Sequence, residues 1–424
     1  MNIDMQAYVK RDTYLNRLIV RRNNNMVKAI TGPRRAGKSF LLNPIFKNYL
    51  LEQGVQEDHI ISISFDIEDE DTPRELLDRE KLKEYLYSRI ISKTEPYYVF
   101  LDEIQEVENF EKIVNGLNNR PNVDVYITGS NSKFLSNDII TIFRGRSDEV
   151  NIMPFTFKEF CQDRQESIGE LWKEYYTYGG LPALRMMPTY EQKTSYLQRL
   201  WKKTYLDDVV ERHHVENREA LEAITDALCS SIGSLTNTSR ITNTLSSVRK
   251  IKISDDTVSK YIGYLEEAFL FNEAKRYNIK GNKYYENIKK YYSVDVGLRN
   301  ARLNYRQLEQ THLMENVIFN ELIHRGYVVD VGVIEARVMK NGKSEYKQYE
   351  VDFIATNGMQ KYYVQSAYRI DTEEKREQEL QSLKRIDDSF RKIVVLGDDI
   401  ATYTDDNGIT YVGLFDFLQN GLPN

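Results

Sequence analysis

The chain has 424 residues, a net charge of −6, 41% hydrophobic residues and 29% charged residues. This composition excludes an intrinsically disordered chain and is typical of a globular protein with about two to four domains. The acidic balance excludes a basic nucleic-acid coat protein, although local basic patches remain possible. The two cysteines, Cys161 and Cys229, are too few for a disulfide framework, which favours a reducing compartment.

The first residues, MNIDMQAYVKRDTYLNRL, contain no apolar stretch of the kind that signal peptides carry. No segment approaches the run of about 18 apolar residues that a membrane helix needs. We therefore expect a cytoplasmic protein that does not associate with a membrane.

Short β-rich runs alternate with helical patterns over the first 160 residues. The expected strands are 27–31, 59–65, 97–102 and 123–129, and the first long helix is expected at 39–53. Strands separated by helices predict βαβ units and a mostly parallel sheet. The fold class expected for this region is therefore α/β.

A glycine-rich segment joins the first expected strand to the first expected helix. Its sequence, GPRRAGKS at 32–39, matches the phosphate-binding pattern GxxxxGK[ST] in the strand–loop–helix context that this pattern requires. Gly32 and Gly37 let the backbone amides face the phosphates, Lys38 reaches the β- and γ-phosphates, and Ser39 ligates Mg²⁺. The expected ATP-binding residues are Gly32, Pro33, Arg34, Arg35, Ala36, Gly37, Lys38, Ser39 and Phe40.

Two acids end the apolar strand YVFLDE at 98–103. In a parallel sheet that follows a phosphate-binding loop, this pattern indicates a Walker B element. We expect Asp102 to hold Mg²⁺ through water, and Glu103 to orient and deprotonate the attacking water. The alternative is a pair of solvated acids at a strand end.

Two later segments contain candidates for contacts with the γ-phosphate. In TGSN at 128–131, Asn131 is the first candidate and Ser130 the second, with a turn cap as the alternative. In RGR at 144–146, Arg146 is the first candidate and Arg144 the second for an arginine finger, which stabilises the transferring phosphoryl group from a neighbouring subunit. That role predicts a homo-oligomer, and a surface arginine is the alternative.

The pattern changes after Pro154. Residues 156–230 are expected to be helical with a break at 179–182, and a helix over 252–271 is expected to begin at the N-cap Ser254. On that helix Val258, Ile262, Leu265 and Phe269 share one face. From about 310 onward a second α/β unit is expected, with helices at 312–326 and 371–388 and strands at 327–334, 349–356, 361–368 and 392–397.

Together these motifs resemble the AAA family of P-loop ATPases, and more narrowly the bacterial and archaeal ATPases with a C-terminal nuclease-like domain of unknown function. The resemblance covers nearly the whole chain and rests on GPRRAGKS (32–39), FLDEIQ (100–105), ITGSNS (127–132), FRGR (143–146), MPFTFKEF (153–160), GGLP (179–182), YLEEAFL (264–270), KKYYSVDVGLRN (289–300), ENVIFNELIHRGYVV (315–329) and YEVDFIA (349–355). It implies an AAA core at 1–160, a helical lid at 161–235, a winged helix at 236–305 and a restriction-endonuclease-like domain at 306–424. FRGR departs from the commoner Leu-Ala-Gly-Arg, but Arg146 is retained.

The expected winged helix contains two lysine-rich stretches, 249–260 and 275–292, and the second interleaves lysines with tyrosines around a Gly281-Asn282 turn. Lysines there would contact phosphate and tyrosines would stack on bases. The alternative, which the overall acidity supports, is a winged helix that packs only against protein.

The expected C-terminal domain has an incomplete nuclease pattern. Glu315 and Asp352 are available as acids, but Gln365-Ser366-Ala367 stands where Glu-x-Lys is required. Phosphodiester hydrolysis needs Mg²⁺ held by carboxylates and a polarised water. We therefore expect a catalytically inert domain.

The sequence thus predicts an ATP-binding and ATP-hydrolysing AAA ATPase that uses Mg²⁺ and works as an oligomeric machine or switch on DNA. Two alternatives remain open. The first is an ATP-dependent switch that signals to a protein partner, and the second is an ATP-licensed, Mg²⁺-dependent nuclease.

Overall fold

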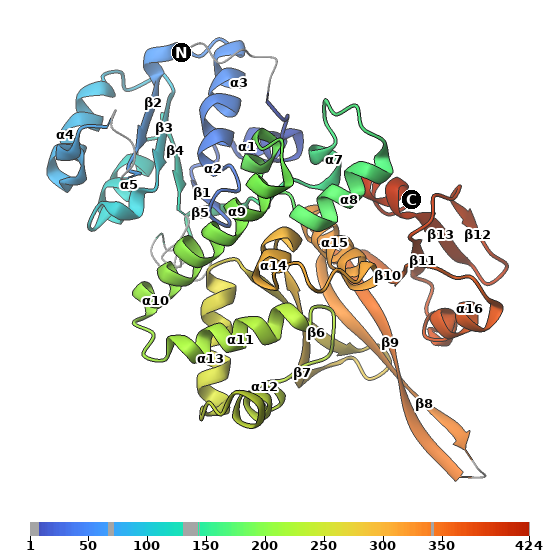
Figure 1. Cartoon of the computed structure of the whole chain (residues 1–424). Helices are drawn as coiled ribbons and strands as arrows, with labels where there is room; N and C mark the ends of the chain where they lie inside the picture. Colours follow the sequence, from blue (N-terminus) through green and yellow to red (C-terminus); the bar gives the residue numbers. More distant parts are fainter. Residues whose placement is uncertain (1–7, 67–71, 130–142, 144, 341–342, 424) are drawn as a thin grey trace. The chain divides into compact units, whose positions relative to one another are not determined.

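The computed structural model describes residues 8–66, 72–129, 143, 145–340 and 343–423. The chain divides into two compact units, Met1–Pro154 and Phe155–Asn424 (Figure 1). No helix in the described part of the chain is both long and apolar enough to cross a membrane.

The first unit is built around a parallel five-stranded sheet with the strand order β2-β3-β4-β1-β5. Its strands are β1 (Val27–Thr31), β2 (Ile60–Ser64), β3 (Tyr97–Asp102), β4 (Val123–Thr128) and β5 (Ser147–Asn151). Its helices are α1 (Asp12–Arg21), α2 (Lys38–Phe40), α3 (Lys47–Glu52), α4 (Arg79–Arg89) and α5 (Phe110–Asn118). A kinked segment (Leu41–Phe46), in which Asn43 is not helical, joins α2 to α3. The predicted α/β class with a parallel sheet is confirmed for this unit.

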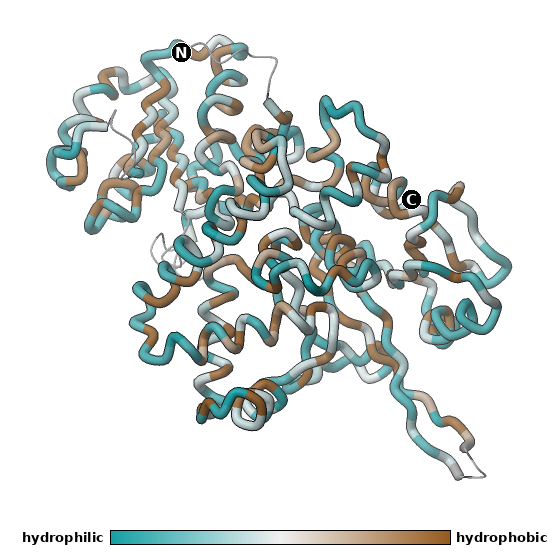
Figure 2. The backbone as a smooth tube through the Cα atoms, viewed as in Figure 1, coloured by the Kyte–Doolittle hydropathy of each residue, from teal (hydrophilic) through white to brown (hydrophobic). Residues whose placement is uncertain are grey.

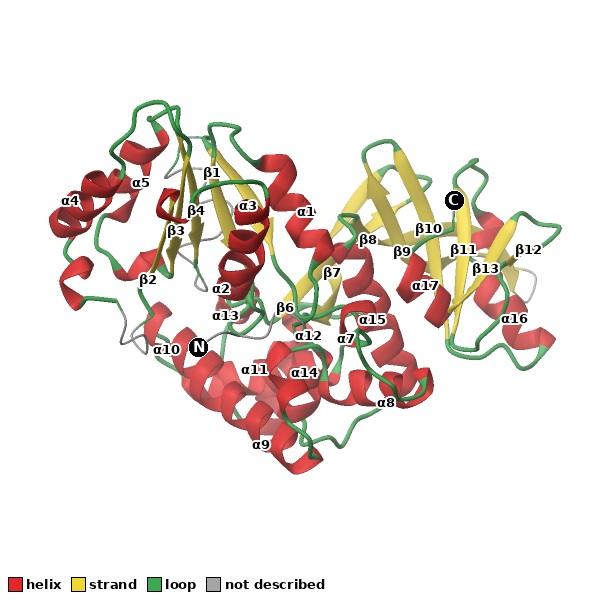
Figure 3. Cartoon of the chain, turned by 90° about the horizontal axis from the view of Figure 1, so that it is seen from above, coloured by secondary structure: helices red, strands yellow, loops and turns green. Residues whose placement is uncertain are grey.

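Helices cover both faces of this sheet, as Figure 3 shows with α1 and α3 on one side and α4 and α5 on the other. Side chains of β1 alternate between the two cores: Val27 and Ala29 join one cluster, and Ile30 joins the other. The alternation follows from strand geometry, in which successive side chains point to opposite faces. Figure 2 shows the resulting hydrophobic segments along the strands of this sheet.

One charge lies inside this sheet. Lys28 on β1 has no exposed surface and pairs with Asp124 on the neighbouring β4, whose Oδ2 also accepts a hydrogen bond from the Tyr126 hydroxyl at 2.7 Å. Burial lowers the pKa of Lys28, and Asp124 opposes this effect. The pair therefore fixes β1 against β4, because a one-residue slip would leave two buried charges without partners.

The second unit begins with a helical region. Its helices are α7 (Phe157–Phe160), α8 (Ile168–Tyr178), α9 (Tyr190–Leu200), α10 (Asp207–His213), α11 (Arg218–Ser230), α12 (Thr238–Thr244), α13 (Asp255–Glu267), α14 (Val296–Arg302) and α15 (Gln310–His324). The predicted cap is confirmed, because the Ser254 hydroxyl accepts from the Thr257 N–H at 3.2 Å. Phe269, which we placed on this helix, lies beyond its end in a left-handed conformation (φ 55°), so that assignment was wrong.

An eight-stranded mixed sheet completes the unit, with the order β12-β13-β11-β10-β9-β8-β6-β7. Its strands are β6 (Phe271–Asn278), β7 (Lys283–Ser293), β8 (Val328–Lys340), β9 (Lys343–Asn357), β10 (Gln360–Ala367), β11 (Arg391–Leu396), β12 (Tyr403–Thr404) and β13 (Ile409–Gly413), with the helices α16 (Glu373–Leu380) and α17 (Leu414–Asn420). The far halves of β8 and β9 pair only with each other among the described residues and form a projecting arm (Figure 1).

The structure shortens one expected helix and extends one expected hairpin. The helix expected at 371–388 is shorter, because α16 ends at Leu380 and only a 3₁₀ turn (Leu383–Arg385) follows. The hairpin expected around Gly281-Asn282 forms as β6 and β7, but its strand β6 also pairs with β8. The expected winged-helix region and the expected C-terminal domain therefore share one sheet.

Candidate nucleotide-binding site

The segment 32–40, which holds the nine predicted ATP-binding residues, turns from the buried strand β1 into α2. Gly32 has φ 136°, and a Cβ atom there would lie 2.1 Å from the Ile152 carbonyl oxygen. Gly37 also adopts a left-handed conformation, with φ 93°. Both positions therefore require glycine for the backbone path itself. Phe40, the last predicted residue, is partly exposed and meets the Tyr8 ring edge-on at 5.5 Å.

Lys38 points into the loop that precedes it. Its side chain is buried, and Nζ donates to the carbonyl oxygens of Gly32 and Pro33, both at 3.1 Å. Burial lowers the pKa of Lys38 to about 8, and Glu103 and Asp102 oppose that shift. A bound phosphate would bring further negative charge close to this ammonium group and would stabilise its charged form.

The structure brings Ser39 and Asp102, the two predicted Mg²⁺ ligands, into hydrogen-bonding contact. The contact is possible because β3 and β1 both flank β4 and end at the same edge of the parallel sheet. Burial raises the pKa of Asp102, while hydrogen bonds from Thr128 and Ser39 oppose the rise. A hydroxyl and a carboxylate are the oxygen donors that Mg²⁺ prefers, so the donor set fits that ion.

Glu103 follows Asp102 in a left-handed conformation, with φ 52°. Its backbone N–H donates to the Thr128 hydroxyl at 3.0 Å, and its carboxylate accepts from the Gln105 amide. A left-handed residue other than glycine is uncommon and is often found where a side chain is positioned for function. The turn directs Glu103 away from the strand while Asp102 remains on it.

Sequence reasoning missed Thr128, the last residue of β4. Its fully buried hydroxyl donates to Asp102 and accepts from the Glu103 N–H, so it links the two acids. The signal that identifies it is a polar residue at the end of a buried strand next to the acidic strand. Asn131 and Ser130, which we predicted for the γ-phosphate contact, lie outside the described residues.

Sequence reasoning also missed Arg11, which precedes α1. This buried guanidinium donates from one nitrogen to the Ala36 carbonyl and from another to the Met153 carbonyl, both at 2.9 Å. It therefore fastens the phosphate-binding loop to the segment after β5. The contacts join residues 25 and 142 positions apart, so no local pattern indicates them.

Arg146 lies beside the amino-terminal end of β1, whereas the loop follows the carboxyl-terminal end of that strand. Its carbonyl accepts from the N–H of Val27, the first residue of β1, and its guanidinium donates to Asn119 at 3.2 Å. The loop starts after the last residue of β1, and a strand of five residues spans roughly 15 Å. Within one chain the structure therefore does not bring Arg146 together with Lys38. Arg144 lies outside the described residues.

Residues 24–161 match the family model of an AAA domain, and residues 169–309 match a domain of unknown function (DUF8612). An uncharacterized protein of Haemophilus influenzae is 34% identical over 418 residues, covering 97% of this chain and 99% of the relative. The chain belongs to the AAA family of P-loop proteins.

This AAA protein also has a relative in Methanocaldococcus jannaschii, an uncharacterized protein that is 28% identical over 420 residues. The match covers 94% of this chain and 88% of the relative. Among solved structures it is similar to the Walker-type ATPase of Pyrococcus abyssi. That similarity has a TM-score of 0.48 and 16% identity, and covers 71% of this chain and 99% of the other.

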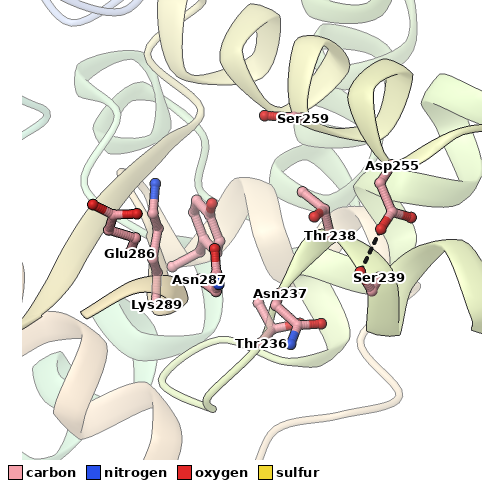
Figure 4. A pocket seen from close by; sticks show the side chains of 10 residues that line it. Thr236, Asn237, Thr238, Ser239, Asp255, Ser259, Glu286, Asn287 and Lys289 are labelled. Carbon is pink, nitrogen blue, oxygen red and sulfur yellow. Dashed lines mark hydrogen bonds between the residues drawn. The ribbon is translucent and has the colours of Figure 1, made fainter.

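A separate polar pocket of about 460 Å³ lies in the second unit of this AAA protein, between α12, α13 and β7 (Figure 4). Its lining residues are Thr236, Asn237, Thr238, Ser239, Asp255, Ser259, Glu286, Asn287, Lys289 and Tyr291. The Ser239 hydroxyl and Asp255 are hydrogen-bonded across it. Its one cation, Lys289, is paired with Glu273 at 2.6 Å. Hydroxyls, amides and acids therefore dominate the lining.

The structure corrects part of the predicted phosphate-contacting set. Lys290 has only 3% exposure and faces carboxylates in the interior, so it is not a phosphate contact. Lys280 is paired with Asp387 at 3.2 Å. The remaining exposed lysines of the predicted patch are Lys250, Lys252, Lys260, Lys275 and Lys283.

Proposed function

We propose that this AAA protein binds ATP with Mg²⁺ and hydrolyses it at the loop 32–39. The observation that carries the proposal is the convergence of Ser39, Asp102, Glu103 and Thr128 beside a buried Lys38. These groups come from three neighbouring strand ends. A ligand at the carboxyl edge of such a sheet would meet all of them at once.

In the proposed mechanism, each side chain has a separate task. Lys38 and the loop amides would hold the β- and γ-phosphates, and Ser39 and Asp102 would hold Mg²⁺. Bound Mg²⁺ would neutralise charge on the phosphates. Glu103 orients the attacking water and accepts its proton, and Thr128 keeps the two acids apart and correctly oriented.

Two variants separate binding from hydrolysis. Lys38→Ala removes the cation that the loop surrounds, and we expect it to abolish nucleotide binding. Glu103→Gln should bind ATP normally and hydrolyse it slowly, because Asp102 still holds Mg²⁺ while the base is lost. Affinity for a fluorescent ATP analogue and steady-state turnover are the measurements. Hydrolysis by Glu103→Gln at the normal rate would refute the assignment of the base.

We further propose that the active site is completed between subunits. The length of β1, roughly 15 Å, separates Arg146 from the phosphate-binding loop of its own chain. Arg146 can therefore act as an arginine finger only at the site of a second copy of the chain. The proposal therefore couples hydrolysis to oligomer formation.

For the second unit, we infer a winged helix formed by α11, α12 and α13 with the β6–β7 hairpin. Three helices before a hairpin and the Thr236–Lys289 bridge support this assignment. The helix α15 against the β8–β9–β10 layer supports the proposed restriction-endonuclease-like domain. The residues that would contact DNA phosphates in the proposed DNA-acting switch are the exposed Lys250, Lys252, Lys260, Lys275 and Lys283.

A protein partner is the second candidate, and the charge pattern favours it on this face. Arg249, Lys280 and Lys289 are paired within the chain, and α13 starts with Asp255 and Asp256. Acids at the start of a helix that enters a groove would repel phosphate. ATPase activity with and without single-stranded, duplex and branched DNA separates the two candidates, because only the DNA switch should be stimulated.

A further inference from the structure

A buried lysine faces three carboxylates inside the second unit. Lys290 on β7 has 3% exposure, and its Nζ lies 2.9 Å from Glu315 Oε1 on α15. The same atom lies 2.8 Å from Glu350 Oε1 and 3.8 Å from Asp352 Oδ1, both on β9. Three elements that are distant in the sequence thus direct their charges to one point.

The surroundings hold these carboxylates in place. The Tyr292 hydroxyl donates to Glu315 at 2.7 Å, and the Ser366 N–H donates to Asp352 Oδ2 at 2.8 Å. Tyr292 shares the face of β7 with Lys290, since strand side chains alternate, and its ring stacks on Phe319 at 4.2 Å. Hydrogen bonds and ring packing therefore hold the cluster in place within the core.

Two buried acids, Glu315 and Asp352, and the partly exposed Glu350 surround one point and require a compensating cation. Burial by itself would lower the pKa of Lys290, but Glu315, Asp352 and Glu350 together raise it above its ordinary value, so the side chain stays charged. The ammonium group thus supplies the positive charge that this cluster needs.

The Lys290 ammonium group lies at hydrogen-bonding distance from two of the three carboxylates, which is farther than a metal–oxygen bond. Oxygen ligands lie about 2.0–2.6 Å from Mg²⁺ or Ca²⁺. The nearest two carboxylate oxygens here lie 2.8 and 2.9 Å from Nζ, which are ordinary distances for charged hydrogen bonds. To form a divalent-cation site at the position of Nζ, Glu315 and Glu350 would have to move slightly closer, and Asp352, at 3.8 Å, would have to move further.

We propose that Lys290 is the built-in cation of this carboxylate cluster, occupying the position that a divalent metal ion would otherwise take. The cluster in the natural chain therefore binds no divalent metal, and removing the lysine charge creates a metal site from Glu315, Glu350 and Asp352. The same contacts fasten β7 to α15 and β9, so the β6–β7 hairpin is held by ion pairs at its base. This inference is independent of the proposed ATPase activity.

The first test uses the natural chain in the absence of nucleotide. Mn²⁺ binding is measured by equilibrium dialysis and by the loss of its free electron-paramagnetic-resonance signal. We expect Glu315→Gln and the natural chain to bind the same amount of Mn²⁺. Mn²⁺ that is bound by the natural chain and lost in Glu315→Gln would overturn the proposal, because the cluster would then hold metal despite the lysine.

The second test removes the cation. We expect Lys290→Ala to bind one more Mn²⁺ per chain than the natural protein, and to gain thermal stability when Mn²⁺ is added. Adding Asp352→Asn to that variant should abolish both effects. Lys289→Ala is the matched control. Lys289 is adjacent in the chain but is paired with Glu273 outside the cluster, so its removal should create no metal site.

If Lys290→Ala folds only when Mn²⁺ is present, the proposal is supported by that dependence. If it folds without metal and binds no additional Mn²⁺, the proposal is wrong. If it does not fold under either condition, Lys290→Met, which keeps the apolar length of the side chain without its charge, is measured in the same way, and no additional Mn²⁺ in that variant would refute the proposal.

Discussion

Thr128→Val is the most direct test of how the candidate site is organised, because the Thr128 hydroxyl is buried between its two acids. The hydroxyl donates to Asp102 and accepts from the Glu103 N–H at 3.0 Å. Hydrogen bonds to charged groups contribute about 1.5–3 kcal/mol and neutral ones about 1 kcal/mol. Valine has nearly the same shape but makes neither bond, so we expect the first unit to lose about 3 kcal/mol of stability.

The same substitution should slow ATP turnover. Without the hydroxyl, the Glu103 backbone loses its anchor, and the largest hydrogen bond opposing the burial-driven rise of the Asp102 pKa is removed. If most of the lost energy is lost from the transition state, about 2.7 kcal/mol corresponds to a roughly 100-fold lower kcat. Turnover at saturating ATP and thermal unfolding are the measurements. Thr128→Ser keeps the hydroxyl and is the control; equal turnover by the valine and serine variants would refute the reasoning.

Three further predictions follow from the structure. Arg146→Ala should lower ATP turnover by about 10³-fold with little effect on ATP binding. Mixing Arg146→Ala with Lys38→Ala subunits should restore activity, and no rescue in mixed oligomers would exclude a role of Arg146 at the site of a neighbouring subunit. Arg11→Ala should weaken ATP binding about tenfold, and Arg11→Lys should not restore it, because only the guanidinium fork spans two carbonyls; normal affinity would contradict this. Burial raises the pKa of Asp295 to about 6, above its value of about 4 in the unfolded chain. The stability that Asp295 contributes is therefore fully present below about pH 4, and the free energy of unfolding falls by about 3 kcal/mol as the pH rises through 6. Urea unfolding between pH 4 and 7 should show this loss, and Asp295→Asn should flatten it.

The parts of the site that sequence predicted are contiguous in the chain. The loop 32–39 is recognised from fixed spacing, since its glycines and lysine act through the local backbone path. Asp102 and Glu103 are recognised because they end a strand whose place in the sheet follows from the βαβ pattern. Each of these predictions needs only the order of elements, which hydrophobic periodicity supplies.

The parts that sequence missed depend on contacts between elements. Thr128 is identified only when β4 is placed beside β3, and Arg11 only when the start of the chain is placed beside the loop. Both residues are ordinary in composition and in local context. Long-range contacts of this kind are set by strand order and helix packing, which no single segment encodes.

The neighbouring lysines of β7 show why a basic, tyrosine-rich strand does not by itself indicate which of its lysines is exposed. In the segment KKYY at 289–292, side chains alternate between the two faces of the strand, so each face receives one lysine followed by one tyrosine. The pattern is therefore the same for either register, and a one-residue slip would exchange the roles of Lys289 and Lys290. The register is selected by the residues that the strand contacts, because the Glu315 carboxylate accepts hydrogen bonds from both Lys290 and Tyr292. The function of each lysine thus follows from the acids that it meets, and those acids lie on α15 and β9 rather than in the strand itself.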